Sequence, residues 1–187
     1  MTDQPMDDQE RWARAVATVT AEYAALPSRL VDVVGIKAAE IRAVKERLCG
    51  FAAEVGAAAI CAACGGECCL RGKYHFTAVD LLVFLAAGMP LFQPHFGGEN
   101  CPYGGESGCR MASSFRPFNC VTYNCEQVEG LWPPERVAAF YGLERLLRQL
   151  YADLESLFNN RFMHGLLMNY SADDQVQGRK ILRFHEG

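Results

Sequence analysis

The sequence lacks a strong excess of charge of either sign. Its 18 Lys and Arg residues and 22 Asp and Glu residues give the 187-residue chain a net charge of −4. Nucleic-acid-binding proteins usually carry a basic patch or stripe, and the nearest approach to one is the trio Arg179, Lys180 and Arg183. We therefore expect no nucleic-acid partner.

Long apolar runs are also missing. No stretch approaches the roughly 20 apolar residues that cross a bilayer, and the acidic residues 1–10 differ from a secretory signal, which begins with basic residues and continues with an apolar run. We expect a cytoplasmic protein without membrane association. In that reducing compartment, clustered cysteines bind metal or perform redox chemistry more often than they form structural disulfides.

The pattern of apolar residues predicts a mainly α fold in one domain, residues 1–187. A helical bundle scaffold would carry a cysteine-rich, loop-rich metal-binding insert. The predicted parts are N-terminal helices over 8–57, the cysteine segment over 58–128, C-terminal helices over 133–170 and a polar tail over 171–187. The cysteine segment is dense in glycine, which favours turns over long helices or strands.

Two helices have clear boundaries in the sequence. Thr77 and Asp80 form a variant of the capping box ahead of the apolar run 81–87, and Gly88 and Pro90 would end that helix. A second helix is predicted to begin at Pro133 and Pro134. Its apolar stripe is too short for a typical coiled coil, so packing against the N-terminal helices is favoured, although a homodimer could use the same stripe: Phe140, Leu143, Leu147, Leu150, Leu154 and Leu157.

Nine cysteines stand against this ordinary background, and eight of them fall within one third of the chain. Cys49 lies alone on a helical pattern and is interpreted as a small core residue. Soft thiolates grouped in this way are typical ligands of transition metals. The candidate metal ligands are Cys61, Cys64, Cys68, Cys69, Cys101, Cys109, Cys120 and Cys125.

The spacing of the first four cysteines is the most specific part of the pattern. Cys61 and Cys64 form a metal-binding knuckle with glycine after it. Cys68 and Cys69 are adjacent, and neighbouring side chains diverge on regular backbone. The pair would therefore share one centre only with a distorted backbone; otherwise it serves two centres or supplies an exchangeable ligand.

Other residues near the cysteines have ordinary explanations. His75 and His95 are each more often surface or core histidines than ligands or proton carriers. Tyr103 is explained by aromatic packing. Four bases flank the cysteines and would stabilise thiolates: Arg71, Lys73, Arg110 and Arg116. No catalytic residue can be assigned.

The ordered motif Cys61-x2-Cys64-x3-Cys68-Cys69, then Cys101, Cys109 and Arg116-Pro117-Phe118-Asn119-Cys120-x4-Cys125, resembles the YkgJ-type cysteine-cluster family. The resemblance covers residues 58–128 and implies chelation of zinc or iron by all eight cysteines. Asn119 stands where arginine is common in that family. A wider branch is linked to methylation of flagellin, but the chain lacks the glycine-rich nucleotide-binding element that such an activity requires.

The sequence leaves alternatives open both for the identity of the metal and for the function. Two zinc sites would usually show two close cysteine pairs, whereas iron–sulfur clusters accept varied spacing, so the pattern favours an iron–sulfur cluster over zinc. We expect a metal-binding protein. The alternatives are an iron–sulfur or dithiol redox enzyme or electron carrier, and a zinc-stapled protein-interaction module whose protein partner is unknown.

Overall fold

The computed structural model describes residues 7–64, 67–98, 101–105, 108–159, 164–170 and 180–184. Helices dominate these residues, which confirms the prediction of a mainly α fold. The strands of the described part are β1 (Gly104–Gly105) and β2 (Gly108–Cys109), which pair antiparallel in one short hairpin. None of the described helices is long and apolar enough to cross a membrane.

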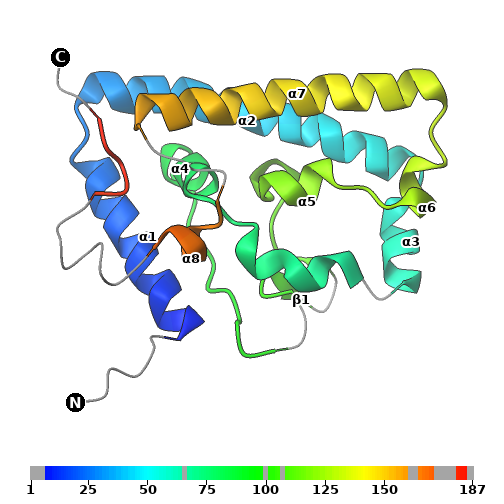
Figure 1. Cartoon of the computed structure of the whole chain (residues 1–187), viewed down its shortest axis with the longest axis horizontal. Coiled ribbons are helices and arrows are strands. Elements are labelled where there is room, and N and C mark those ends of the chain that lie inside the picture. The colour runs from blue at the N-terminus through cyan, green and yellow to red at the C-terminus, as the bar shows by residue number, and fades with distance from the viewer. Residues whose placement is uncertain are drawn as a thin grey trace.

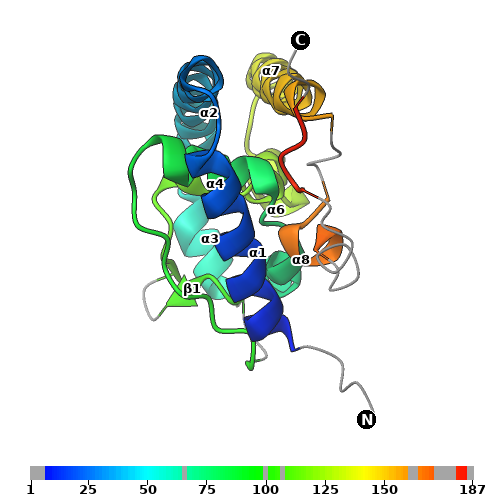
Figure 2. The ribbon, with the colours of Figure 1, turned by 90° about the vertical axis from the view of Figure 1, so that its left-hand side faces the viewer.

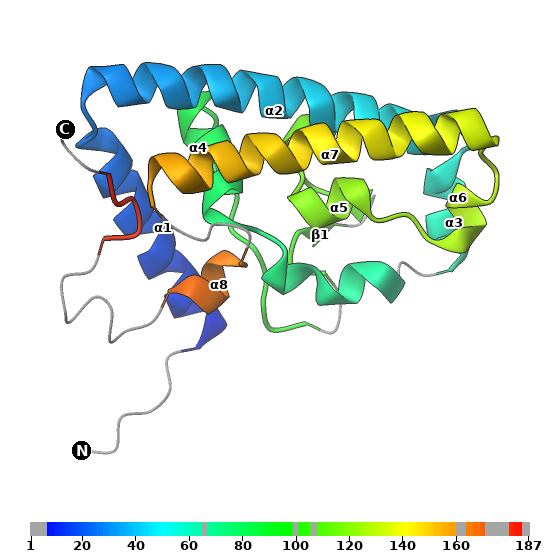
Figure 3. The ribbon, with the colours of Figure 1, turned by 45° about the horizontal axis from the view of Figure 1, so that its top comes forward.

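Four helices form what we call the frame of the molecule: two long helices together with α1 (Asp8–Ala24) and α4 (Ala78–Ala86). Helix α2 (Ser28–Glu54) and helix α7 (Pro134–Leu157) lie side by side along one edge (Figures 1 and 3). Five of the six residues in the predicted α7 stripe are buried, and Leu157 packs at the margin of the core. The stripe therefore faces the interior of the chain, as favoured by its short length, and does not offer a surface for a homodimer.

Contacts at both ends fix α2 and α7 as an antiparallel pair. At one end the ring of Phe51 lies 5.7 Å from that of Phe140 and 5.8 Å from that of Trp132. At the other end Lys37 Nζ lies 2.8 Å from Asp153 Oδ2. Helix α1 (Asp8–Ala24) crosses the end of this pair and packs on α4 (Ala78–Ala86), as Figure 2 shows.

A buried ion pair joins three helices of the frame. Lys45 of α2 and Asp80 of α4 are fully buried, with 2.7 Å between Nζ and Oδ1. The hydroxyl of Tyr151 on α7 donates to the same carboxylate oxygen at 2.5 Å. Thr77 donates its backbone N–H and hydroxyl to the other oxygen and completes the predicted capping box. Asp80 thus keeps its charge compensated inside the core.

The cysteine segment is more helical than expected. It consists of short elements: α3 (Ala57–Ala63), η1 (Glu67–Tyr74, a 3-10 helix), α4, the β1–β2 hairpin, η2 (Ser113–Phe115), α5 (Phe118–Thr122) and α6 (Glu126–Glu129). Alanine at five of the seven α3 positions favours helix, and the glycine-rich composition of the segment obscured it. The expectation of no long helix or strand in most of this segment is met.

The C-terminal region adds a short helix and a return to α1. Helix α8 (Leu166–Asn169) lies within the helix predicted for 161–170, of which residues 160–163 are outside the described part. Residues 180–184 belong to the predicted polar tail, yet Leu182 is buried, and its backbone N–H donates to the carboxylate of Glu22 on α1. This part of the tail lies against the frame.

Candidate metal centre

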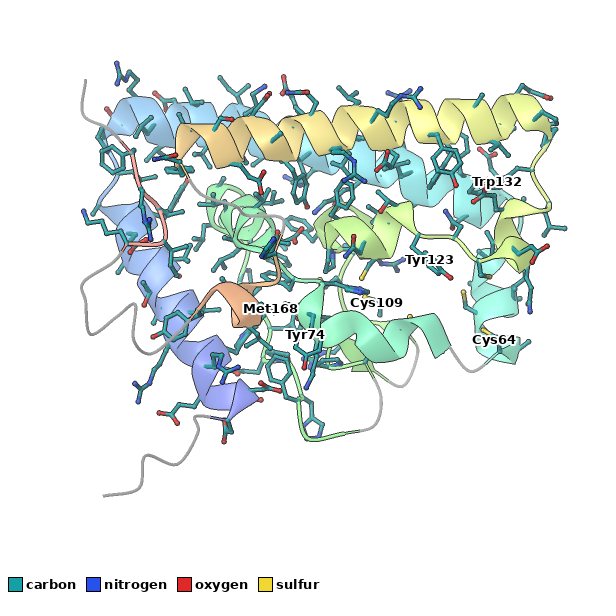
Figure 4. The ribbon with its side chains drawn as sticks, in the orientation of Figure 1. Cys64, Tyr74, Cys109, Tyr123, Trp132 and Met168 are labelled. Atoms are coloured by element: carbon teal, nitrogen blue, oxygen red, sulfur yellow. The ribbon has the colours of Figure 1, made fainter. Side chains whose placement is uncertain are left out.

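The cysteines occupy the short elements below the frame. Eight of the nine are described with their side chains, and none of these eight forms a disulfide. Figure 4 shows Cys64 beside α3 at one end of the molecule and Cys109 near its middle. Two residues that are well separated in a projection are at least as far apart in space, so these two cysteines do not belong to one compact group.

Four cysteines form what we call the central thiol group: Cys69, Cys101, Cys109 and Cys120. Burial raises the pKa of the Cys120 thiol far above its usual value, and the charges of Cys101, Asp80, Cys109 and Cys69 raise it further. Cys120 as a residue is nevertheless exposed, so the group reaches the surface. Its members come from η1, the hairpin region and α5, which brings distant parts of the sequence together.

Cys101 begins a tight turn of the chain. Gly104 N–H donates to Cys101 O at 2.9 Å and closes the turn. Burial raises the pKa of the Cys101 thiol, and the backbone N–H groups of Tyr103 and Gly104 offset part of this increase. Such N–H groups favour the ionised thiol, which is the form that ligates metals.

Gly72 lets the Cys101 sulfur approach η1. A Cβ atom at Gly72 would lie 2.8 Å from Cys101 Sγ, a separation that real Cβ atoms do not show. Tyr103 secures the same region, because its ring is buried and its hydroxyl donates to Lys73 O at 3.3 Å. The position next to Cys101 is thus built for a residue without a side chain.

His75 is the histidine that reaches the cysteines. Its Nδ1 lies 3.6 Å from Cys120 Sγ, and its backbone N–H donates to Gly72 O at 2.9 Å in the turn that ends η1. Burial lowers the pKa of the imidazole, and the charge of Asp80 partly offsets this effect. His95 has the same standing in the sequence, but its ring is exposed.

Three further cysteines form what we call the outer thiol group: Cys61 and Cys64 at the end of α3, and Cys125 at the start of α6. Helices α3 and α6 pack against each other. Cys64 caps α3, and its Sγ donates to Cys61 O at 3.3 Å. The predicted knuckle is therefore a helix end rather than a tight turn.

Asn124, next to Cys125, was not identified from the sequence. Its side-chain amide nitrogen is buried and has no hydrogen-bond partner among the described residues. Buried donors are nearly always paired, and ligand thiolates are acceptors that commonly receive such N–H groups. An isolated asparagine beside a cysteine gives no signal of this in a sequence.

The adjacent cysteines lie on the 3-10 helix η1. Such a helix has about three residues per turn, so successive positions are about 120° apart. Cys69 belongs to the central thiol group, whereas the side chain of Cys68 is outside the described part of the chain. This backbone favours the alternative in which the two cysteines serve different centres, which stays a prediction.

The flanking bases are mostly directed elsewhere. Lys73 Nζ lies 3.0 Å from Asp8 Oδ2, and Arg110 donates to Gln93 O at 3.1 Å. Arg116 lies near Cys49 and donates to Met111 O at 3.3 Å. Cys49 is half-buried at the margin of the core, as its prediction as a core residue implied. The side chain of Arg71 is outside the described residues.

Among the described residues, no three Cys, His, Asp or Glu side chains lie close enough together to ligate one ion. The contact of Cys120 with His75 and the turn at Cys101 are already formed. The donor set suits zinc or an iron–sulfur cluster, since thiolate and imidazole ligate both. Binding would require the remaining thiols to close on these two features.

The depression between α2 and α7 has a different character. Its lining includes Arg47, Phe51, Glu54, Arg136 and Leu143, with no cysteine or histidine, and Arg136 and Glu54 form an ion pair across it. It lies on the frame, and nothing in it connects to the thiol groups.

Comparison with protein-family models gives no match, and neither the curated proteins nor the solved structures contain a significant match to this chain. The resemblance to the YkgJ-type family therefore stays a prediction that rests on the cysteine motif alone.

Proposed function

We propose that the protein binds a transition metal, as an iron–sulfur cluster or as zinc, through its clustered cysteine thiolates. The central thiol group would hold one centre, and the outer thiol group with Cys68 would hold a second. The bound metal would supply positive charge that offsets crowded thiolates. The protein's own part is to gather the ligands.

The observation that carries this proposal is the turn at Cys101. The position beside its sulfur is Gly72, where a Cβ atom would lie 2.8 Å from Cys101 Sγ, and the charges of Cys69, Cys101 and Cys109 all raise the pKa of Cys120. Buried cysteines that serve only packing behave as small hydrophobes and need no such gathering of thiols. The unpartnered amide of Asn124 beside Cys125 supports the second centre.

Metal analysis of protein purified without oxygen tests the proposal. Wild-type protein should carry stoichiometric zinc, or iron with sulfide and broad visible absorption. Cys101→Ser should lose most of the metal of the central group, whereas Cys49→Ser, a matched change at the core margin, should keep it. A wild-type protein that stays free of metal after anaerobic reconstitution with zinc, or with iron and sulfide, would overturn the proposal.

A reducing location, as in the cytoplasm, belongs to the same proposal. Ligand thiolates must remain reduced to bind metal. The location could be tested by following the tagged full-length protein in cell fractions, where accumulation in an oxidising compartment would contradict it.

A further inference from the structure

We propose that His75 is a metal ligand through its Nδ1 atom, on the same centre as Cys120. The inference rests on the proposed metal binding and makes it more specific. The central site would be a mixed imidazole–thiolate centre and not an all-cysteine one. The eight-cysteine motif contains no sign of this ligand.

The distance between the two donor atoms is the first argument. A tetrahedral metal with an M–S bond of about 2.3 Å and an M–N bond of about 2.0–2.1 Å separates its sulfur and nitrogen ligands by about 3.6 Å. Cys120 Sγ and His75 Nδ1 lie 3.6 Å apart. A thiol–imidazole hydrogen bond joins these two atoms in the structure, and an ion could replace its proton with little movement of either side chain.

The position of His75 in the chain is the second argument. The carbonyl of Gly72 accepts a hydrogen bond from the backbone N–H of His75. The absence of a side chain at Gly72 leaves room for Cys101 Sγ. One turn of η1 therefore brings both His75 and Cys101 to the central thiol group.

His95 shows that this placement is specific. It is exposed, and its Nε2 and Cε1 atoms lie 3.8 and 3.9 Å from where a Cβ atom at Gly97 would stand. Its backbone N–H donates to Pro102 O at 3.0 Å, next to the hairpin region. The two histidines look equivalent in the sequence, and only one meets a cysteine in the described structure.

A nitrogen ligand has a chemical consequence. A four-coordinate centre that includes His75 needs three of the four central thiols and leaves one outside the coordination sphere. In an iron–sulfur cluster, replacement of thiolate by imidazole raises the reduction potential. In a zinc site it lowers the negative charge of the centre by one, because imidazole binds in its neutral form.

Cobalt(II), a spectroscopic substitute for zinc, tests the ligand in the full-length protein under anaerobic conditions. The variants are His75→Asn, which keeps an N–H group near the Nδ1 position but ligates poorly, His75→Cys, and the matched control His95→Asn. We expect His75→Asn to weaken cobalt binding at least about tenfold in a chelator competition. His75→Cys should restore binding with stronger sulfur-to-cobalt charge-transfer absorption, and His95→Asn should match the wild type.

The outcomes separate the two proposals. If wild-type protein binds neither cobalt, zinc nor iron, the proposed function fails. If wild-type protein binds metal and His75→Asn shows the same affinity and spectrum, His75 is only a hydrogen-bond donor and this inference alone is overturned. If the variants do not fold, pulsed electron paramagnetic resonance of the cobalt-loaded wild type decides. A directly bound histidine nitrogen gives a strong hyperfine coupling to the cobalt, and absence of that coupling refutes the assignment.

Discussion

The helical frame and the cysteine segment of this protein are stabilised in different ways. The frame of α1, α2, α4 and α7 buries aromatic and aliphatic side chains and one compensated ion pair. In the cysteine segment Cys64, Cys69, Cys109 and Cys120 are exposed, and the connecting elements are short. Apolar burial is sufficient to explain the frame, whereas under the proposed function a bound metal would hold the thiols together.

The largest predicted effect concerns the buried pair in the frame. Lys45→Met removes the positive partner of a fully buried carboxylate, and loss of one member of such a pair costs about 3–5 kcal/mol of unfolding free energy. Urea denaturation measures this loss. Lys37→Met, in the partly exposed pair with Asp153, should cost no more than about 1 kcal/mol; equal losses for the two variants would contradict the distinction between a buried and a partly exposed ion pair.

An intermediate effect concerns a glycine in each region. Gly72→Ala places a methyl group against Cys101 Sγ and should weaken metal binding by about 10–100-fold, as disturbed support of a ligand usually does. Gly35→Ala in α2 meets no atom within 4 Å and should stabilise the frame by about 0.5–1 kcal/mol. Chelator competition measures the metal affinity of both variants, and thermal unfolding measures their stability. If the two variants change metal affinity to the same extent, the distinction between the two glycines is wrong.

The smallest effect concerns the exposed end of the frame. A hydrogen bond from Lys37, with a second from Gln149, lowers the pKa of the Asp153 carboxyl. A lowered folded-state pKa stabilises the protein above the unfolded value of about 3.9, and this contribution is lost as the pH falls through the folded value. Asp153→Asn should therefore lower stability at pH 7 by about 0.2–1 kcal/mol, and the difference should vanish near pH 2. A difference that persists at pH 2 would refute this origin.

The sequence was a good guide to the frame because its signals are local. The three-and-four spacing of the α7 stripe predicts one buried face, and the four residues from Thr77 to Asp80 are enough to predict a helix start. The sequence also shows which residue types gather in the cysteine segment. The α7 stripe and the helix start at Thr77 can both be predicted because the residues that define them lie close together in the sequence.

The arrangement of the candidate centre could not be predicted in the same way. His75 and Cys120 are 45 residues apart, and their contact depends on how η1 and α5 are placed against the frame. Gly72 looks like any glycine of the segment until the position of Cys101 is known. The Cys101-x-x-Gly104 spacing is a local signal of the turn that the Gly104 N–H to Cys101 O hydrogen bond closes.

Hydrogen exchange of the full-length protein, compared with and without bound metal, tests most directly the contrast between the helical frame and the cysteine segment. The metal-bound form should gain protection in η1, in the turn at residues 101–105 and in α5, whereas α2 and α7 should exchange as in the metal-free form. Unchanged exchange in the cysteine segment, or protection gained equally across α2 and α7, would contradict the account of an independent frame and a metal-dependent segment.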